Sequence, residues 1–84
     1  MFDCMITFRS VMPAQRAEEQ LLTQRIGCRV RRTPKWMERQ GCGYSLWLEH
    51  SDLPEAVAIL NGGNITYKKL YRRTDSGKLE EIGL

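Results

Sequence analysis

The stretch CRVRRTPKWMERQGCGYSLWLE, residues 28–49, is the part of the chain that decides the expected fold. Polar and apolar residues alternate over 28–33 and again over 44–49, a pattern that is typical of half-buried strands. Pro34 ends the first strand, because proline has no amide proton to donate to a strand ladder. The stretch therefore predicts two strands joined by a loop that carries the triplet Gly41-Cys42-Gly43.

The residues before this stretch predict one strand and one helix. Residues 4–9 are rich in strand formers, and Ser10 has the side chain of a helix N-cap, with Pro13 in the first turn. Apolar residues then recur at helical spacing over 14–26. Gly27 is typical of a helix C-cap, so we expect the helix to extend to this glycine.

The residues after the stretch predict a second helix and a last strand. Asp52 and Glu55 have the spacing of a capping box, which marks a helix start. The glycine-rich residues 61–64 end that helix and turn the chain. Residues 65–73 form the last predicted strand, and the remainder, 74–84, is either an extra strand or a loose tail.

The predicted order is β-α-β-β-α-β, which is the ferredoxin-like arrangement of an α+β protein. Two helices then cover one face of a four-stranded antiparallel sheet. The other face is left open or used for self-association. A length of 84 residues is that of a single domain, so we assign residues 1–84 to one unit.

The composition favours a globular protein over a disordered or membrane-spanning one. The chain is 42% hydrophobic and 27% charged, which is typical of a globular protein and not of a disordered one. No apolar run approaches the roughly 20 residues of a membrane span, and the N-terminus lacks the pattern of a signal peptide. We therefore expect a cytoplasmic protein with reduced thiols. The cysteine spacing matches no zinc motif and there is one histidine, so we expect no metal or other cofactor.

Basic residues form two clusters, although the net charge is only +3. Such clusters are found on solvated strand edges, and they are also found where an anionic partner such as RNA binds. The mild charge favours the first interpretation. The clusters are Arg25, Arg29, Arg31, Arg32, Lys35 and Arg39, followed by Lys68, Lys69, Arg72 and Arg73.

Cys42 is the candidate for chemistry. A glycine on each side, Gly41 and Gly43, leaves the thiol accessible and the backbone free. The predicted topology brings this loop to the end of the sheet where the first strand ends and the first helix begins, beside Arg9 and Ser10.

Positive groups around Cys42 favour its thiolate form. Lys35 and Arg39 lie in the same loop, and a helix N-terminus adds a positive dipole end. The alternative is that the two glycines shape a tight strand entry and Cys42 fills a small gap. Cys4 and Cys28 each start a strand at the opposite end of the sheet, and we interpret both as structural.

The chain resembles a small bacterial family named for a putative role as selenium/sulfur carriers. The resemblance spans about residues 6–71, and its most specific part is the pairing of Thr33-Pro34 with Cys42-Gly43. The chain departs from the family pattern at Lys35, where arginine is common. The segments that carry the resemblance are Phe8-Arg9-Ser10, Ala14, Ala17-Glu18, Leu21-Leu22, Ile26-Gly27-Cys28-Arg29, Thr33-Pro34 and Cys42-Gly43.

The resemblance implies that Cys42 bears a persulfide or selenopersulfide, taken from a protein donor and passed to a protein acceptor. Trp36 and Met37 are bulky for a loop, and they either form a docking surface or fold back on the core. A carrier of this kind is not a stand-alone catalyst, and no base such as His50 is expected near Cys42.

Two other functions remain open at this point. One is an interaction or regulatory domain that forms a homodimer through the open sheet face, with Trp47 and Leu70 in the apolar patch. The other is an RNA- or nucleotide-binding module in which Arg29, Arg31 and Trp47 lie together on that face. The third strand lacks the aromatic pattern of RNA-recognition domains, which makes nucleic acid the less favoured partner.

Overall fold

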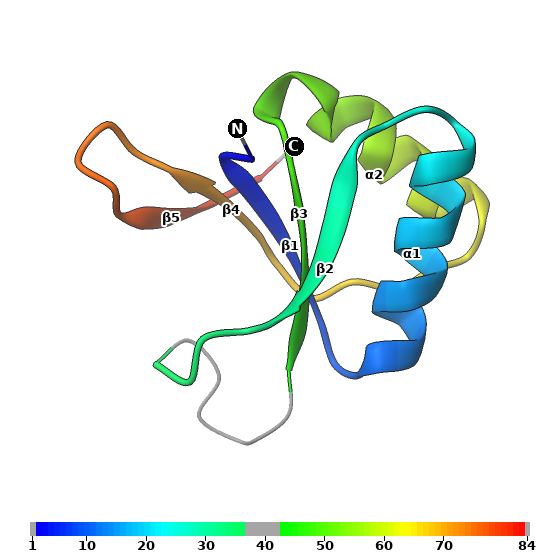
Figure 1. Cartoon of the computed structure of the whole chain (residues 1–84), viewed down its shortest axis with the longest axis horizontal. Coiled ribbons are helices and arrows are strands. Elements are labelled where there is room, and N and C mark those ends of the chain that lie inside the picture. Colours follow the sequence, from blue (N-terminus) through cyan, green and yellow to red (C-terminus); the bar gives the residue numbers. More distant parts are fainter. Residues whose placement is uncertain (1, 37–42, 84) are drawn as a thin grey trace.

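The computed structural model describes residues 2–36 and 43–83 (Figure 1). The elements, in chain order, are β1 Cys4–Phe8, α1 Val11–Thr23, β2 Cys28–Arg32, β3 Tyr44–Leu48, the short 3-10 helix η1 His50–Asp52, α2 Leu53–Gly62, β4 Leu70–Arg73 and β5 Leu79–Ile82.

The strands form one antiparallel sheet in the order β2-β3-β1-β4-β5. Both helices lie on the same side of it (Figure 1). The predicted α+β class is confirmed, but the predicted number of four strands is wrong, because residues 79–82 add β5 at the edge. The ferredoxin-like classification stays a prediction.

The core lies between the sheet and the two helices. Alternate residues of β1, Cys4, Ile6 and Phe8, point into it and are fully buried. Apolar residues at helical spacing on α1 and α2 cover them, as the sequence pattern predicts. The helix residues that are buried are Ala14, Ala17, Leu21, Leu53, Ala56, Val57 and Leu60.

The first helix ends earlier than predicted, at Thr23 and not at Gly27. The amide of Ile26 donates to the carbonyl of Leu21 at 2.9 Å, and the amide of Arg25 donates to Leu22 at 3.0 Å. These two bonds form a Schellman motif with Arg25 in the left-handed region, at φ 64°. Ile26 then packs into the core, so its apolar character belongs to the cap and not to a further helical turn.

Arg25→Gly is expected to stabilise the protein. An L-residue in the left-handed region costs about 1 kcal/mol that glycine does not, and part of this gain is offset by the greater entropy of glycine in the unfolded chain. Because Arg25 is exposed, little packing is lost. Denaturant unfolding should show an increase of up to about 1 kcal/mol. Arg16→Gly, inside the exposed face of α1, is the control and should lower stability by about 1 kcal/mol.

The predicted caps at the helix starts are not formed by side chains. Ser10 is the N-cap of α1 and has extended backbone, but its hydroxyl makes no capping bond. The prediction of a capping box formed by Asp52 and Glu55 is wrong. Asp52 has helical backbone, because it is the last residue of η1, and its amide donates to the carbonyl of Glu49. The chain thus enters α2 through a 3-10 turn.

Of the predicted strand 65–73, only residues 70–73 form a strand. Residues 65–69 are irregular, and β4 starts at Leu70. Lys68 and Lys69 both face Thr7: the Lys68 amide donates to the Thr7 carbonyl at 2.7 Å, and the Thr7 amide donates to the Lys69 carbonyl at 2.9 Å. Two residues opposite one are a β-bulge, which interrupts the ladder and bends the strand.

The edge strand β2 is covered by a side chain from α1. The amide of Val30 donates to the Glu18 carboxylate at 2.9 Å, so this edge amide has a partner within the domain. Covering an edge in this way protects a sheet against pairing with other chains.

Glu18→Ala is expected to lower the free energy of unfolding by about 1.5–3 kcal/mol, because it removes a hydrogen bond to a charged group and leaves the Val30 amide without its partner. Glu18→Gln keeps an acceptor oxygen and should lose less. Glu19→Ala, on the exposed neighbour, is the control for helix propensity in urea unfolding. Equal losses for Glu18→Ala and Glu19→Ala would show that the edge bond contributes nothing.

Candidate functional site

The loop that carries the candidate cysteine leaves and re-enters the sheet at one end. The amide of Thr33 donates to the carbonyl of Gly43 at 3.0 Å and closes the base of the loop. Tyr44 pairs with Phe8 on one side and with Arg32 on the other, so the end of β1, the end of β2 and the start of β3 are level. This is also the end where α1 begins (Figure 1).

Gly41, Cys42, Met37 and Arg39 fall in the segment 37–42, outside the described residues, so their predicted roles remain predictions. Gly43 is described and is buried at the base of the loop. Gly43 and the start of β3 lie at this end of the sheet.

Arg9 and Ser10 line a cleft at the N-terminus of α1. The walls are the first turns of α1 and the segment 64–69, which contributes Lys68 and Lys69. The first turn of α1 contains no acidic residue, so the positive end of the helix dipole is not neutralised by its own sequence. Lys35 is exposed and does not line this cleft. The described residues therefore give a positive environment on the helix side, with Lys35 apart from it.

The hydroxyl of Thr33 is buried at the base of the same loop. Its side chain belongs to a residue that is only 6% exposed, and its Oγ1 has no hydrogen-bond partner among the residues described. A buried hydroxyl without a partner is costly, by about 1–3 kcal/mol. Thr33 is thus a polar group held in place beside the predicted site, and the sequence alone gave no sign of its burial.

Cys4 and Cys28 are poor nucleophiles in this structure. Burial raises the pKa of Cys4 to about 11, with a further rise from Asp3 and an opposing effect of Arg72. Burial also raises the pKa of Cys28 to about 11, helped by the charge of Glu18. Both residues pair with Leu48, at the end of the sheet away from Gly43. Their placement agrees with the structural role expected for them.

Metal binding finds no support in the parts of the chain that the structure describes. Within residues 2–36 and 43–83, no three His, Cys, Asp or Glu side chains gather into a group that could hold an ion.

His50 lies beyond the last residue of β3, at the other end of the strand from Gly43, and its backbone amide donates to the Asp3 carboxylate at 2.7 Å. No helix among the described residues has the length and apolar character to cross a membrane.

A second hollow lies on the side of the sheet without helices. Trp47 forms part of it, and the guanidinium of Arg73 lies 5.3 Å from the centre of its ring. The hollow has a volume of about 380 Å³. Its lining residues are Phe2, Arg31, Arg32, Pro34, Trp47 and Arg73.

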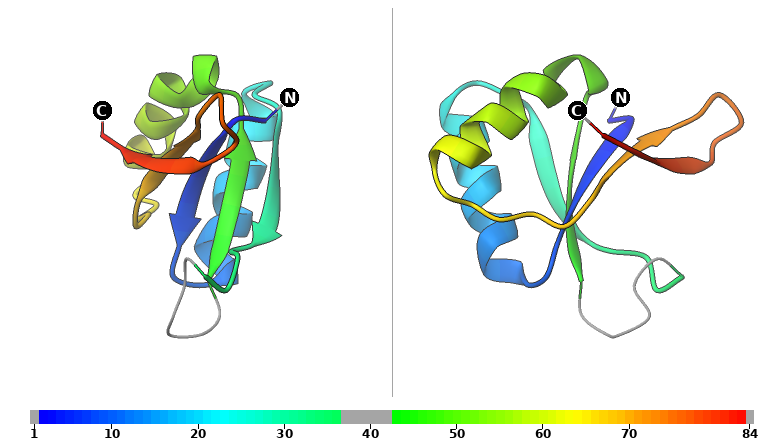
Figure 2. Two further views of the ribbon diagram at one scale, coloured as in Figure 1. Left: turned by 90° about the vertical axis from the view of Figure 1, so that its left-hand side faces the viewer. Right: turned by 180° about the vertical axis from the view of Figure 1, so that it is seen from behind.

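The hairpin of β4 and β5 forms one wall on this side. Figure 2 (left) shows β5 crossing in front of the upper part of the sheet. A neighbouring hollow of about 560 Å³ shares Pro34, Trp47 and Arg73, and adds Trp36 from one side and the hairpin residues Gly77, Lys78 and Leu79 from the other. We call the two hollows together the hairpin cleft.

Part of this cleft could be predicted from the sequence and part could not. Strand alternation places Arg29, Arg31 and Trp47 on one face, and the register puts Arg29 directly opposite Trp47. The contribution of Arg73 and Lys78 was missed, because it depends on how the hairpin bends over the face. Met5, on the same face, is fully buried, so this face is not bare.

These observations define a small α+β domain. It has a loop at the α1 end of its sheet and a cleft on the face of the sheet that the helices do not cover. Residues 3–72 match the family model described as "Putative Se/S carrier protein-like", and the chain belongs to this family. No curated protein and no solved structure matches the chain.

Proposed function

We propose that this protein carries sulfur or selenium as a persulfide or selenopersulfide on Cys42, and passes it to a partner protein. The description of the chain's family, "Putative Se/S carrier protein-like", supports a carrier role. The observation that carries the proposal is the state of the other thiols: the pKa of Cys4 and the pKa of Cys28 are both raised to about 11. Of the three cysteines in the chain, this leaves Cys42 for nucleophilic chemistry.

The proposed step is an exchange at sulfur. The thiolate of Cys42 attacks the terminal sulfur of a persulfide on the donor protein. A new S–S bond forms to Cys42 while the donor's own S–S bond breaks, and the donor cysteine leaves as a thiolate. The proton on the transferred sulfur stays with it, and no oxidant or reductant is consumed. Delivery is the same exchange with an acceptor thiolate as the attacking group.

The groups around Cys42 have defined parts in this proposal. Gly41 and Gly43 leave the sulfur open to a partner. Arg9, Lys35 and Arg39 favour the thiolate by their charge, and Ser10 does so as the first residue of the positive end of α1. The cations that line the α1 cleft support this assignment.

Donor and acceptor are proposed to dock beside the loop, on Trp36 and Met37. Trp36 is 70% exposed, which is unusual for so large an apolar side chain and supports a contact surface there. A carrier that works between two proteins needs no cofactor of its own. We place the protein in the cytoplasm, where thiols such as that of Cys42 are kept reduced.

Incubation with a cysteine desulfurase and cysteine tests the proposal. Intact-protein mass spectrometry should show a gain of one sulfur atom, which a thiol reductant removes. A selenocysteine lyase with selenocysteine tests the selenium form in the same way. A protein that gains neither sulfur nor selenium from these donors would contradict the proposal and favour the alternative that Cys42 fills a gap.

A further inference from the structure

The hairpin cleft combines positive charge with aromatic surface. Among the described residues that line it, four are cations, Arg31, Arg32, Arg73 and Lys78, and none carries a carboxylate. Arg31 and Arg73 are exposed on the two walls of the cleft, while the guanidinium of Arg32 lies 5.9 Å from the centre of the Tyr44 ring, which packs against the core. A site lined in this way complements an anion.

The aromatic residues add flat surfaces between these charges. Both tryptophans of the chain line the cleft, and Phe2 lines one of its hollows. Trp47 is half-buried under the Arg73 guanidinium, whereas Trp36 is 70% exposed. Bases stack on aromatic rings and on guanidinium planes, so the cleft offers stacking surfaces beside phosphate-binding groups.

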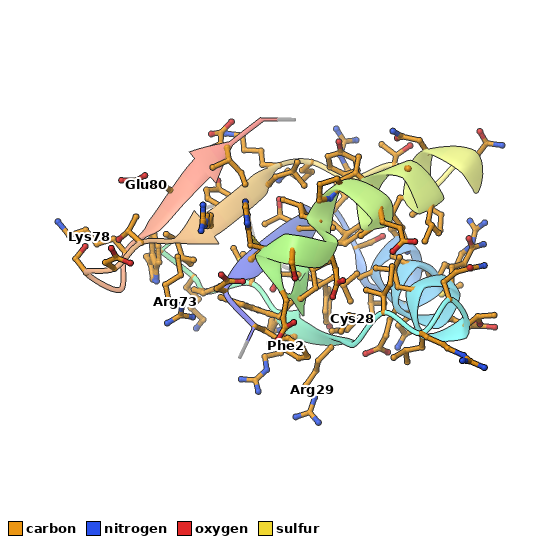
Figure 3. All side chains as sticks on the ribbon, turned by 90° about the horizontal axis from the view of Figure 1, so that it is seen from above. Phe2, Cys28, Arg29, Arg73, Lys78 and Glu80 are labelled. Carbon is orange, nitrogen blue, oxygen red and sulfur yellow. The ribbon has the colours of Figure 1, made fainter. Side chains whose placement is uncertain are left out.

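The cleft consists of two adjoining hollows and is not a single pocket. One hollow contains Phe2 and Arg31, the other contains Lys78 and Leu79, and the two meet at Trp47 and Arg73. In Figure 3, Arg73 and Lys78 lie toward the hairpin, and Phe2 lies toward β2. A channel with charges spread along it fits a chain of linked phosphates better than one small anion.

We propose that the hairpin cleft binds single-stranded nucleic acid. Phosphates lie between Arg31 of β2 and the cations of the β4–β5 hairpin, and a base stacks on Trp36 or on the Arg73–Trp47 pair. This function does not use the thiol of Cys42, although Trp36 is shared with the docking surface proposed for the sulfur donor and acceptor. We expect sequence-independent binding, because stacking and phosphate contacts tolerate any base.

Tryptophan fluorescence tests the proposal directly, because both tryptophans lie in the cleft. Titration with a short oligouridylate at low salt should quench the emission, and the affinity should fall steeply with added salt. Trp36→Ala should weaken binding by about 5- to 150-fold, the equivalent of one stacked base. Arg31→Gln and Arg73→Gln should each reduce the slope of log K against log salt by about 0.7.

Matched variants on the helix side test whether binding depends on the cleft residues or only on the net charge of the protein. Arg16→Gln removes the same charge and Met12→Ala removes an exposed apolar side chain, and both should bind like the wild type. Cys42→Ser should also bind normally, which distinguishes this proposal from the carrier function. Three results would overturn it: no quenching at low salt, equal weakening by Arg16→Gln and Arg31→Gln, or equally tight binding of polyglutamate, which has charge without bases.

Discussion

Cys42→Ser is expected to abolish the sulfur gain completely. Serine keeps the size of the side chain but its hydroxyl cannot form a persulfide, so the mass after incubation with desulfurase and cysteine should equal that of the untreated variant. The double variant Cys4→Ala, Cys28→Ser should gain sulfur like the wild type, because both of these thiols are held protonated. The comparison assigns the sulfur to one residue.

Stability is the control for this comparison. Thermal unfolding of Cys42→Ser should match the wild type within about 0.5 kcal/mol, as is usual for substitutions away from the core. A sulfur gain that persists in Cys42→Ser would contradict the assignment of the carrier site. A loss of stability of more than about 2 kcal/mol would indicate a buried, structural Cys42.

The second large effect is expected in thiol reactivity. At pH 8 a thiol with a pKa of about 11 is ionised to about one part in a thousand, while an unperturbed cysteine is ionised to about one part in four. Iodoacetamide should therefore alkylate Cys4 and Cys28 at least about 200-fold more slowly than Cys42. Peptide mapping of partially alkylated protein measures the three rates separately.

Unfolded protein is the control for alkylation, because all three cysteines should react at similar rates in urea. In the folded protein, the rate at Cys28 should rise with pH until about pH 11, and Glu18→Gln should increase it by removing a negative charge. Equal rates at Cys28 and Cys42 in the folded state would refute the prediction. The free energy of unfolding should also fall as pH rises from about 9 to about 11, because the unfolded chain releases these protons first.

The strands beside the loop could be predicted because their pattern is local. Alternation over 28–33 and 44–49 gave β2 and β3, and the apolar spacing of residues 14–21 gave the buried face of α1. The end of α1 could not be predicted in the same way. Gly27 looks like the cap, but Arg25 takes the left-handed conformation so that Ile26 can enter the core, and that choice depends on tertiary packing.

The candidate site also has features that the sequence predicts and features that depend on tertiary packing. Sequence and topology suffice to bring the base of the loop, Thr33 and Gly43, to the end of the sheet where α1 starts. They do not reveal that the Thr33 hydroxyl is buried, or that the hairpin bends far enough to place Arg73 over Trp47. Both features result from contacts between segments that are distant in the chain, for which a local pattern carries no signal.

The position of β1 also constrains how the protein is made. This strand is the first to be synthesised, and it lies in the middle of the sheet between β3 and β4. All five of its residues are buried in the finished domain, yet its second partner, β4, ends only at Arg73. A nascent chain can pair β1 with β3 early, but it must keep the other edge of this apolar strand unpaired until β4 has left the ribosome. We therefore expect folding to be completed late, and truncation before β4 to leave an aggregation-prone strand edge exposed to the cell's chaperones and proteases.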